Sequence, residues 1–163
     1  MKRIVRLMVG TLLALVVAAP MVYAQSDNGG APEDASATYG PEILAQFPGH
    51  CSFPMQLELS GKGKEIRLPD GSLILTSPGL DVTITNLDNG EQATFNITGS
   101  VHQSTSENGD VTTVMTGRNF AIDPVAGTTV VIGRFSFVFD AEGNLIQPQM
   151  GTGQRIDVCE LLS

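Results

Sequence analysis

Apolar and polar residues alternate one by one through most of the chain after residue 53. The clearest runs place apolar side chains at every second position, at residues 55–59, 80–84, 93–97 and 135–139. A strand points successive side chains to opposite faces of its sheet, so this period indicates half-buried strands. Apolar spacing typical of a helix of ten or more residues is missing from this part of the chain. The pattern therefore predicts an all-β domain.

Four short turn signals separate the alternating runs. They are Asp70-Gly71, Asn89-Gly90, Asn108-Gly109 and Glu142-Gly143. Dipeptides of this kind supply the positive φ angles that tight type I′ hairpin turns require. We therefore expect an antiparallel meander in which neighbours in sequence pair in the sheet. The expected strands cover residues 53–60, 63–69, 72–77, 80–87, 91–99, 101–106, 110–117, 128–140, 144–149 and 153–159. Residues 118–127 are the one connection that does not look like a simple hairpin.

Residues 1–24 have the three parts of a cleavable signal peptide. Lys2, Arg3 and Arg6 form a basic start, residues 7–19 form an uncharged apolar core, and residues 22–24 (VYA) form a cleavage site with small residues. The apolar core is too short to span a bilayer, so we expect cleavage after Ala24 rather than an uncleaved anchor. The mature chain is then secreted and has no membrane span. Residues 25–49 read as a flexible polar leader, with one helical turn begun by Pro41, and residues 50–163 as the all-β domain.

The two cysteines, Cys51 and Cys159, flank this domain. In an oxidising compartment we expect them to form a disulfide bond, which requires Cα atoms within about 7 Å of each other. Antiparallel pairing of the first and last strands would bring the two cysteines together. That favours a closed or nearly closed β-barrel, which also removes the sheet edges. A two-sheet β-sandwich with adjacent ends remains the alternative.

The charge of the mature chain excludes some partners. Three of the nine Lys and Arg residues lie in the signal peptide and all 17 acidic residues lie outside it, so the mature chain carries a net charge of −11. Nucleic acid and anionic membranes should repel such a chain. The acidic residues do not form the spaced loop that binds calcium in EF-hands. The simplest explanation of the acidity is solubility outside the cell.

Few residues suggest chemistry. His50 and His102 stand far apart, and with two oxidised cysteines they do not supply the clustered ligands of a zinc site. Glu58 and Glu65 could form a glycosidase-like carboxylate pair, but their alternation with apolar residues places both on solvated faces. We therefore predict no catalytic, metal-binding or cofactor-binding residues, and no cofactor.

Three further motifs have structural explanations or weak signals. Phe135, Phe137 and Phe139 form a stripe at strand spacing, for which core packing is the ordinary explanation. Asn96 begins an N-glycosylation sequon, and the stretch 151–154 (GTGQ) precedes no helix that could complete a phosphate loop.

Several short motifs carry a resemblance to known proteins. They are residues 85–87 (TNL), 95–99 (FNITG), 107–110 (ENGD), 123–124 (DP) and 157–160 (DVCE). Over residues 50–163 the chain resembles an uncharacterised family of small secreted, actinobacterial-like β-rich proteins with one cysteine pair spanning the termini. The resemblance implies export and an all-β fold, and it implies no active residue.

These observations favour a non-catalytic module that binds an unknown small ligand in a barrel interior or at its open end. One alternative is an extracellular surface or protein-interaction domain, which would use a strand face or the acidic exterior. Another is a small β-barrel enzyme of the cyclase or isomerase kind, which would need His102 or a carboxylate inside a cavity.

Overall fold

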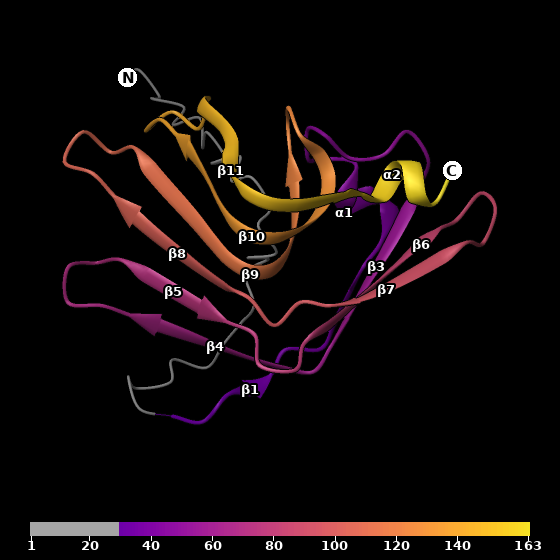
Figure 1. Cartoon of the computed structure of the whole chain (residues 1–163), viewed down its shortest axis with the longest axis horizontal. Helices are drawn as coiled ribbons and strands as arrows, with labels where there is room; N and C mark the ends of the chain where they lie inside the picture. Colours follow the sequence, from indigo (N-terminus) through magenta and orange to yellow (C-terminus); the bar gives the residue numbers. More distant parts are fainter. Residues whose placement is uncertain (1–29) are drawn as a thin grey trace, which may run out of the picture.

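The computed structural model describes residues 30–163, so the predicted signal peptide lies outside the described residues. These residues form two antiparallel sheets (Figure 1). The large sheet has, in spatial order, β1 (Glu33–Asp34), β4 (Lys62–Arg67), β5 (Leu73–Thr76), β8 (Ser100–Thr105), β9 (Val111–Asp123), β10 (Gly127–Phe139) and β11 (Leu145–Asp157). The small sheet has, in spatial order, β2 (Ala37–Tyr39), β3 (Met55–Ser60), β6 (Asp81–Asn86) and β7 (Gln92–Asn96). The all-β prediction is confirmed.

The chain follows an up-and-down meander that serves both sheets. A single residue, Gly61, separates β3 in the small sheet from β4 in the large one. Short connections likewise join β5 to β6 and β7 to β8, so each of these passes of the chain contributes a strand to both sheets. From β8 onward, β9, β10 and β11 follow in order within the large sheet. The predicted pairing of sequence neighbours is confirmed across the hairpin turns, as in β4–β5, β6–β7 and β8–β9. It does not hold for β3–β4, β5–β6 and β7–β8, because the two members of each pair lie in different sheets.

The prediction of a barrel is wrong. The second half of β9 pairs with β10 and not with β7, so the small sheet and the end of the large one separate and pack face to face. Phe120 and Ile122 of β9 enter one buried cluster with Val82 and Ile84 of β6. We call this cluster the inter-sheet core. The sheets are thus held together by side-chain packing and not by the edge-to-edge strand pairing that would close a barrel. The two-sheet alternative therefore describes the fold better.

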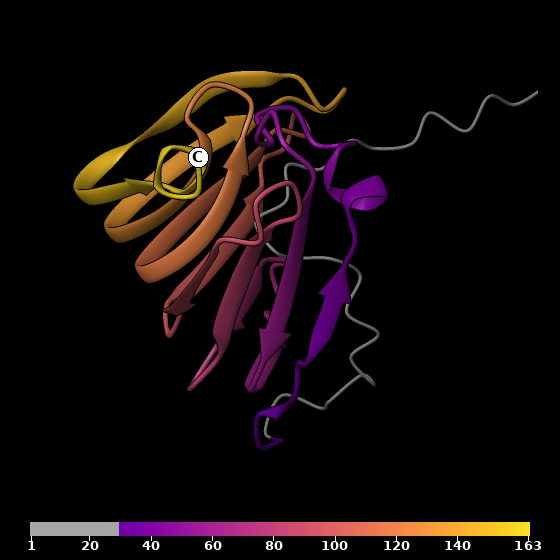
Figure 2. The same cartoon turned by 90° about the vertical axis from the view of Figure 1, so that its right-hand side faces the viewer.

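Glycines let the last three strands bend sharply. Gly117, Gly133 and Gly153 are partners in register across β9, β10 and β11. Gly133 has φ +144°, and a Cβ atom there would lie 2.2 Å from the carbonyl oxygen of Thr152. Figure 2 shows the strong curvature of these strands, in orange and yellow, on the side opposite α1. A side chain at these positions would block the close backbone approach that the bend requires.

The bend corrects two expected boundaries. The strand expected to end at residue 117 continues through the glycine to Asp123, and Asp123–Gly127 forms the hairpin turn to β10. The two strands expected at 144–149 and 153–159 form one strand, β11, which a short helix α2 (Val158–Leu161) follows. Glycine usually weakens a strand, whereas here it allows a paired strand to change direction.

The bend also encloses a second buried cluster, which we call the concave core. Its members lie on one face of the bent strands, and they include Ala121 and Val131 on one side of the glycine row and Met115, Phe135 and Phe137 on the other. In a flat sheet, residues 131 and 135 of one strand would be about 13 Å apart. Their common cluster shows that the sheet folds onto itself.

The residues expected to form a flexible leader are partly structured from residue 30 onward. β1 pairs with β4, β2 pairs with β3, and α1 (Pro41–Leu44) forms the helical turn expected at Pro41. Backbone pairing along a sheet edge needs few apolar side chains, which explains why the polar composition of this segment did not indicate it. Leu44 is 1% exposed and anchors the segment to the inter-sheet core.

The turn signals are correctly placed but their type differs from the prediction. Every residue with positive φ in the described chain is a glycine, so type I′ turns, which need two such residues, are not formed. At Asp70-Gly71, Gly71 N–H donates to the Leu68 carbonyl and Leu68 N–H donates to the Ser72 carbonyl, both at 2.9 Å. This is a type I turn closed by a glycine bulge.

Candidate functional site

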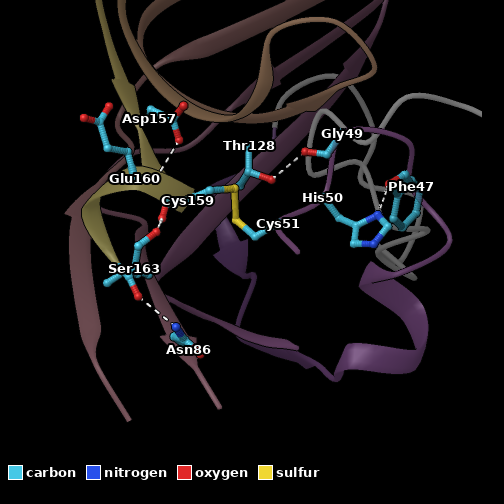
Figure 3. Close-up of a disulfide and its surroundings, with 11 residues drawn as sticks. Phe47, Gly49, His50, Cys51, Asn86, Thr128, Asp157, Cys159, Glu160 and Ser163 are labelled. Carbon is cyan, nitrogen blue, oxygen red and sulfur yellow. Dashed lines mark hydrogen bonds between the residues drawn. A yellow bond between two sulfur atoms is a disulfide. The ribbon is translucent and has the colours of Figure 1, made fainter. Parts of the chain in front are cut away.

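A disulfide bond joins Cys51 to Cys159, as the sequence predicted, with a Cα–Cα distance of 5.3 Å (Figure 3). Cys51 precedes β3 of the small sheet, and Cys159 lies in α2 at the end of β11. The cysteines meet although β3 and β11 belong to different sheets, so pairing of the first and last strands is not what brings them together. The bond instead ties together the ends of the two sheets.

Hydrogen bonds hold the segments around the disulfide in place. Thr128 at the start of β10 donates its hydroxyl to the Gly49 carbonyl at 3.0 Å. The buried amide of Asn86 donates to the Leu162 carbonyl at 2.8 Å, and Asp157 caps α2 by accepting from the Glu160 N–H at 3.0 Å. Figure 3 shows how these bonds surround the sulfur atoms. The loop before β3, the β6–β7 turn, β10 and α2 are thereby fixed relative to one another.

A pocket of about 200 Å³ lies beside the disulfide. It is lined by Pro41, Leu44, Ala45, His50, Cys51, Ser52, Phe53, Pro54 and Met55. Its floor is apolar and buried, since Leu44 is 1%, Cys51 2% and Met55 2% exposed. Ala45 and Ser52 at its rim are exposed, so the pocket opens to solvent.

His50 is the one ionisable side chain in this lining, because Cys51 is oxidised. Its Nδ1 lies 2.8 Å from the Phe47 carbonyl oxygen. A carbonyl can only accept, so Nδ1 carries the hydrogen and Nε2 of the neutral ring is left as an acceptor. The lining includes no carboxylate that could orient the imidazole toward Ser52. The arrangement suits an apolar group with one hydrogen bond at the rim, and it does not form a triad.

The structure does not bring the other candidate residues together. His102 lies on β8, where it is exposed and pairs with Ile74 and Val114 away from the pocket. Glu58 belongs to the small sheet and accepts from Gln56 at 2.6 Å. Glu65 belongs to the large sheet and forms an ion pair of 2.5 Å with Arg67. The two carboxylates are thus solvated or locally paired, and neither lines the pocket.

The phenylalanine stripe is part of the core, as predicted. Phe135 and Phe137 are each 3% exposed, and Phe137 packs edge-on against Phe139 with 5.7 Å between ring centroids. Asn96 of the sequon is half-buried at the end of β7 and donates its amide to Asp81 at 2.9 Å.

Sequence reasoning missed the pocket itself. Its lining comes from α1 and from the loop that leads into β3, two segments without a motif. Their only signals were Pro41, which begins the helical turn, and Cys51, whose partner is 108 residues away. Among residues 30–163, no helix is long and apolar enough to cross a bilayer. In the same range, no three His, Cys, Asp or Glu side chains are placed to hold a metal ion.

Comparisons with known proteins add no relative. No protein-family model, no curated protein and no solved structure matches the chain. The resemblance to small secreted bacterial β-proteins therefore stays a prediction, and the candidate site rests on its own geometry.

Proposed function

We propose that this protein is a secreted, non-catalytic binding module whose binding site is the pocket beside the disulfide. The observation that carries the proposal is the apolar floor of Leu44, Cys51 and Met55 beneath a rim that opens to solvent. Apolar surface in a concave, solvent-accessible site is the usual basis of small-molecule binding.

The size of the pocket limits what it takes. Sites for drug-sized ligands have volumes of about 300–1,000 Å³. At about 200 Å³ the pocket suits a smaller group, such as one aromatic ring or one branched aliphatic chain. A hydrogen bond to His50 at the rim would orient that group. The ligand class we propose is therefore a small apolar molecule, or an apolar moiety of a larger one, with a single donor.

Export completes the proposal. The disulfide and the expected signal peptide both fit an extracellular protein, because disulfides persist in oxidising compartments. N-terminal sequencing of the protein recovered from the medium of its host tests export, and the first residue should be Gln25.

The test is an NMR titration of the labelled mature protein with two small probes, indole and p-cresol. Each has one ring and one donor. We expect chemical-shift changes at Leu44, Cys51 and Met55, with loss of the changes in Ala45→Trp, whose ring would fill the pocket from its exposed rim. Ala45 is exposed, so the substitution should leave the buried core intact.

Gln46→Trp is the matched control, since Gln46 is the exposed neighbour of Ala45 and does not line the pocket. This variant should bind the probes as the unchanged protein does. Probe-induced shifts that are absent, or that persist in Ala45→Trp, would contradict the proposal.

A second candidate function is docking of an extracellular protein at the same end of the molecule. Four exposed apolar residues lie on segments next to the pocket lining. They are Ile43 in α1, Leu87, whose N–H donates to the Pro54 carbonyl, Val125 in the turn that approaches Gly49, and Leu161, two residues after Cys159. An apolar side chain of a partner could then occupy the pocket. Replacing both Leu87 and Leu161 with Ser should weaken the binding of such a partner and leave the binding of p-cresol unchanged.

A further inference from the structure

The loop that carries His50 is anchored on both sides of this residue. The Gly49 carbonyl accepts from the Thr128 hydroxyl at 3.0 Å, and Cys51 is held by the disulfide. The backbone N–H of His50 itself donates to the Phe47 carbonyl at 3.2 Å. His50 is nevertheless exposed and lines the pocket. Its ring is therefore held at a fixed place on the pocket rim, in contact with solvent.

The imidazole can change its hydrogen-bonding character without leaving this place. Its Nδ1 lies 2.8 Å from the Phe47 carbonyl oxygen (Figure 3). Because a carbonyl oxygen only accepts, Nδ1 carries its hydrogen in the neutral ring and in the protonated ring alike. Protonation therefore adds a hydrogen at Nε2 and preserves the bond to Phe47. The ring nitrogen left for a guest changes from an acceptor to a donor.

Other groups near the pocket do not change charge in the same way. His50 is the one ionisable side chain of the lining. The charged side chains on the surrounding elements are carboxylates: Glu42 on α1, Asp88 and Glu91 in the β6–β7 turn, Asp123 in the β9–β10 turn, and Asp157 and Glu160 at α2. Carboxyl groups ordinarily titrate below pH 5, whereas histidine is the side chain that changes charge between pH 5 and 8. A change in binding over this range therefore points to the imidazole.

We propose that His50 sets the class of guest that the pocket takes, and that protonation of its ring reverses the choice. This inference rests on the function proposed above. With the neutral ring, Nε2 accepts, so an apolar guest with an N–H donor is preferred. With the protonated ring, Nε2 donates, so an apolar guest with a carbonyl acceptor is preferred. A mismatched guest leaves a polar atom without a partner, which is costly. The pocket thus holds a donor guest at neutral pH and releases it on acidification.

Two probes of opposite character test this inference on the mature protein. Indole offers only a donor, acetophenone offers only an acceptor, and neither titrates between pH 5 and 8. From pH 8 to pH 5 we expect indole to bind about fivefold more weakly and acetophenone about fivefold more tightly. The NMR shifts of Leu44 and Met55 report binding, and a ring-proton shift of His50 reports its protonation in the same samples. The affinities and the protonation should follow one pH curve.

Three variants assign the effect. His50→Asn keeps an amide N–H for the Phe47 carbonyl and lacks the outer nitrogen, so it should bind both probes without dependence on pH. His102→Gln removes the other histidine, exposed on β8, and Glu42→Gln removes the carboxylate of α1. Both are controls and should keep the pH dependence of the unchanged protein.

The outcomes separate this inference from the function on which it rests. If both probes bind and their affinities do not change with pH, or if the change persists in His50→Asn, this inference is overturned and the binding site stands. If neither probe binds at pH 8 or at pH 5, the proposed function is overturned and this inference with it.

Discussion

Single residues decide where this chain can bend and where it can turn. Twelve glycines of the described chain have positive φ, and they fall into two kinds. Gly71 is in a turn, where an added Cβ atom would meet nothing within 4 Å. Gly133 lies in the middle of a strand and faces a neighbouring backbone. At Gly71 the absence of a side chain therefore matters only for the positive φ angle. At Gly133 it also allows the close approach of the neighbouring backbone.

Gly133→Ala should destabilise the protein far more than Gly71→Ala. The first change adds a Cβ atom 2.2 Å from the Thr152 carbonyl oxygen at φ +144°, where the neighbour is backbone and cannot move freely. We expect a loss of about 3 kcal/mol or more. The second adds strain alone, about 1–2 kcal/mol. Urea unfolding followed by circular dichroism compares them, and equal losses would mean that the bend does not depend on close backbone approach.

The turn carboxylates give a prediction for pH. The side-chain and backbone N–H groups of Asn144 bond the Asp140 carboxylate and hold its pKa below the usual 3.8. A lowered pKa means that this contribution to stability is complete above the unfolded-state value and is lost as pH falls through the folded-state value. Asn144→Ala should therefore raise the pKa of Asp140, as read from its carboxyl carbon shift in NMR. Ser72 lowers the pKa of Asp70 in a similar turn, and that pKa should not change in this variant.

Among the elements, β11 differs most from what its sequence suggests. It contains Gly151 and Gly153, and its Arg155 side chain lies over the ring of Phe135, the register partner of Gly151. Arg155 then bonds a carbonyl six residues earlier in its own strand. The strand is thus held in its bent form by one of its own side chains.

Arg155→Met should open this contact. The change removes a charge-assisted hydrogen bond and a cation–π contact and keeps the apolar stem, so we expect a loss of about 2 kcal/mol. Arg134→Met is the control, because Arg134 is exposed beside the bend and has no ion pair in the described chain. Hydrogen exchange of the β11 amides should accelerate in the first variant only. Equal exchange in both would show that the apolar contacts alone hold the bend.

For the molecule as a whole, the disulfide ties the ends of the two sheets on opposite sides of the inter-sheet core. It closes a loop across 108 residues of sequence, nearly the length of the β-domain. Without it, α2 would be held by Val158 and Leu162 packing and by the bond from Asn86.

Replacing both cysteines with Ser should lower the unfolding free energy by about 2–5 kcal/mol. The loss comes chiefly from the greater freedom of the unfolded chain, so the native sheets should remain. Reduction of the unchanged protein should produce the same loss, which distinguishes the missing bond from poor packing of serine. Denaturation midpoints that coincide with those of the oxidised protein would show that the cross-link contributes little.

The sequence by itself determined where most strands lie and which neighbours pair across the hairpin turns. Alternation at Leu57 and Leu59, or at Val82 and Ile84, is a local property that burial of one strand face enforces in any tertiary arrangement. The turn glycines and the cysteine pair are equally local signals. The sequence also indicated the export signal and the lack of a catalytic constellation, which are expectations drawn from composition and spacing.

Only the tertiary structure decided between a barrel and two sheets, and where a binding pocket lies. Alternation is identical in both architectures, since it says which face is buried and not what covers it. The choice rests on Gly117, Gly133 and Gly153 falling in register across three strands, which lets the chain fold over and bury Phe120 against Val82. The pocket lies between α1 and the loop into β3, and its place follows from the packing of Leu44 and Cys51 in the inter-sheet core.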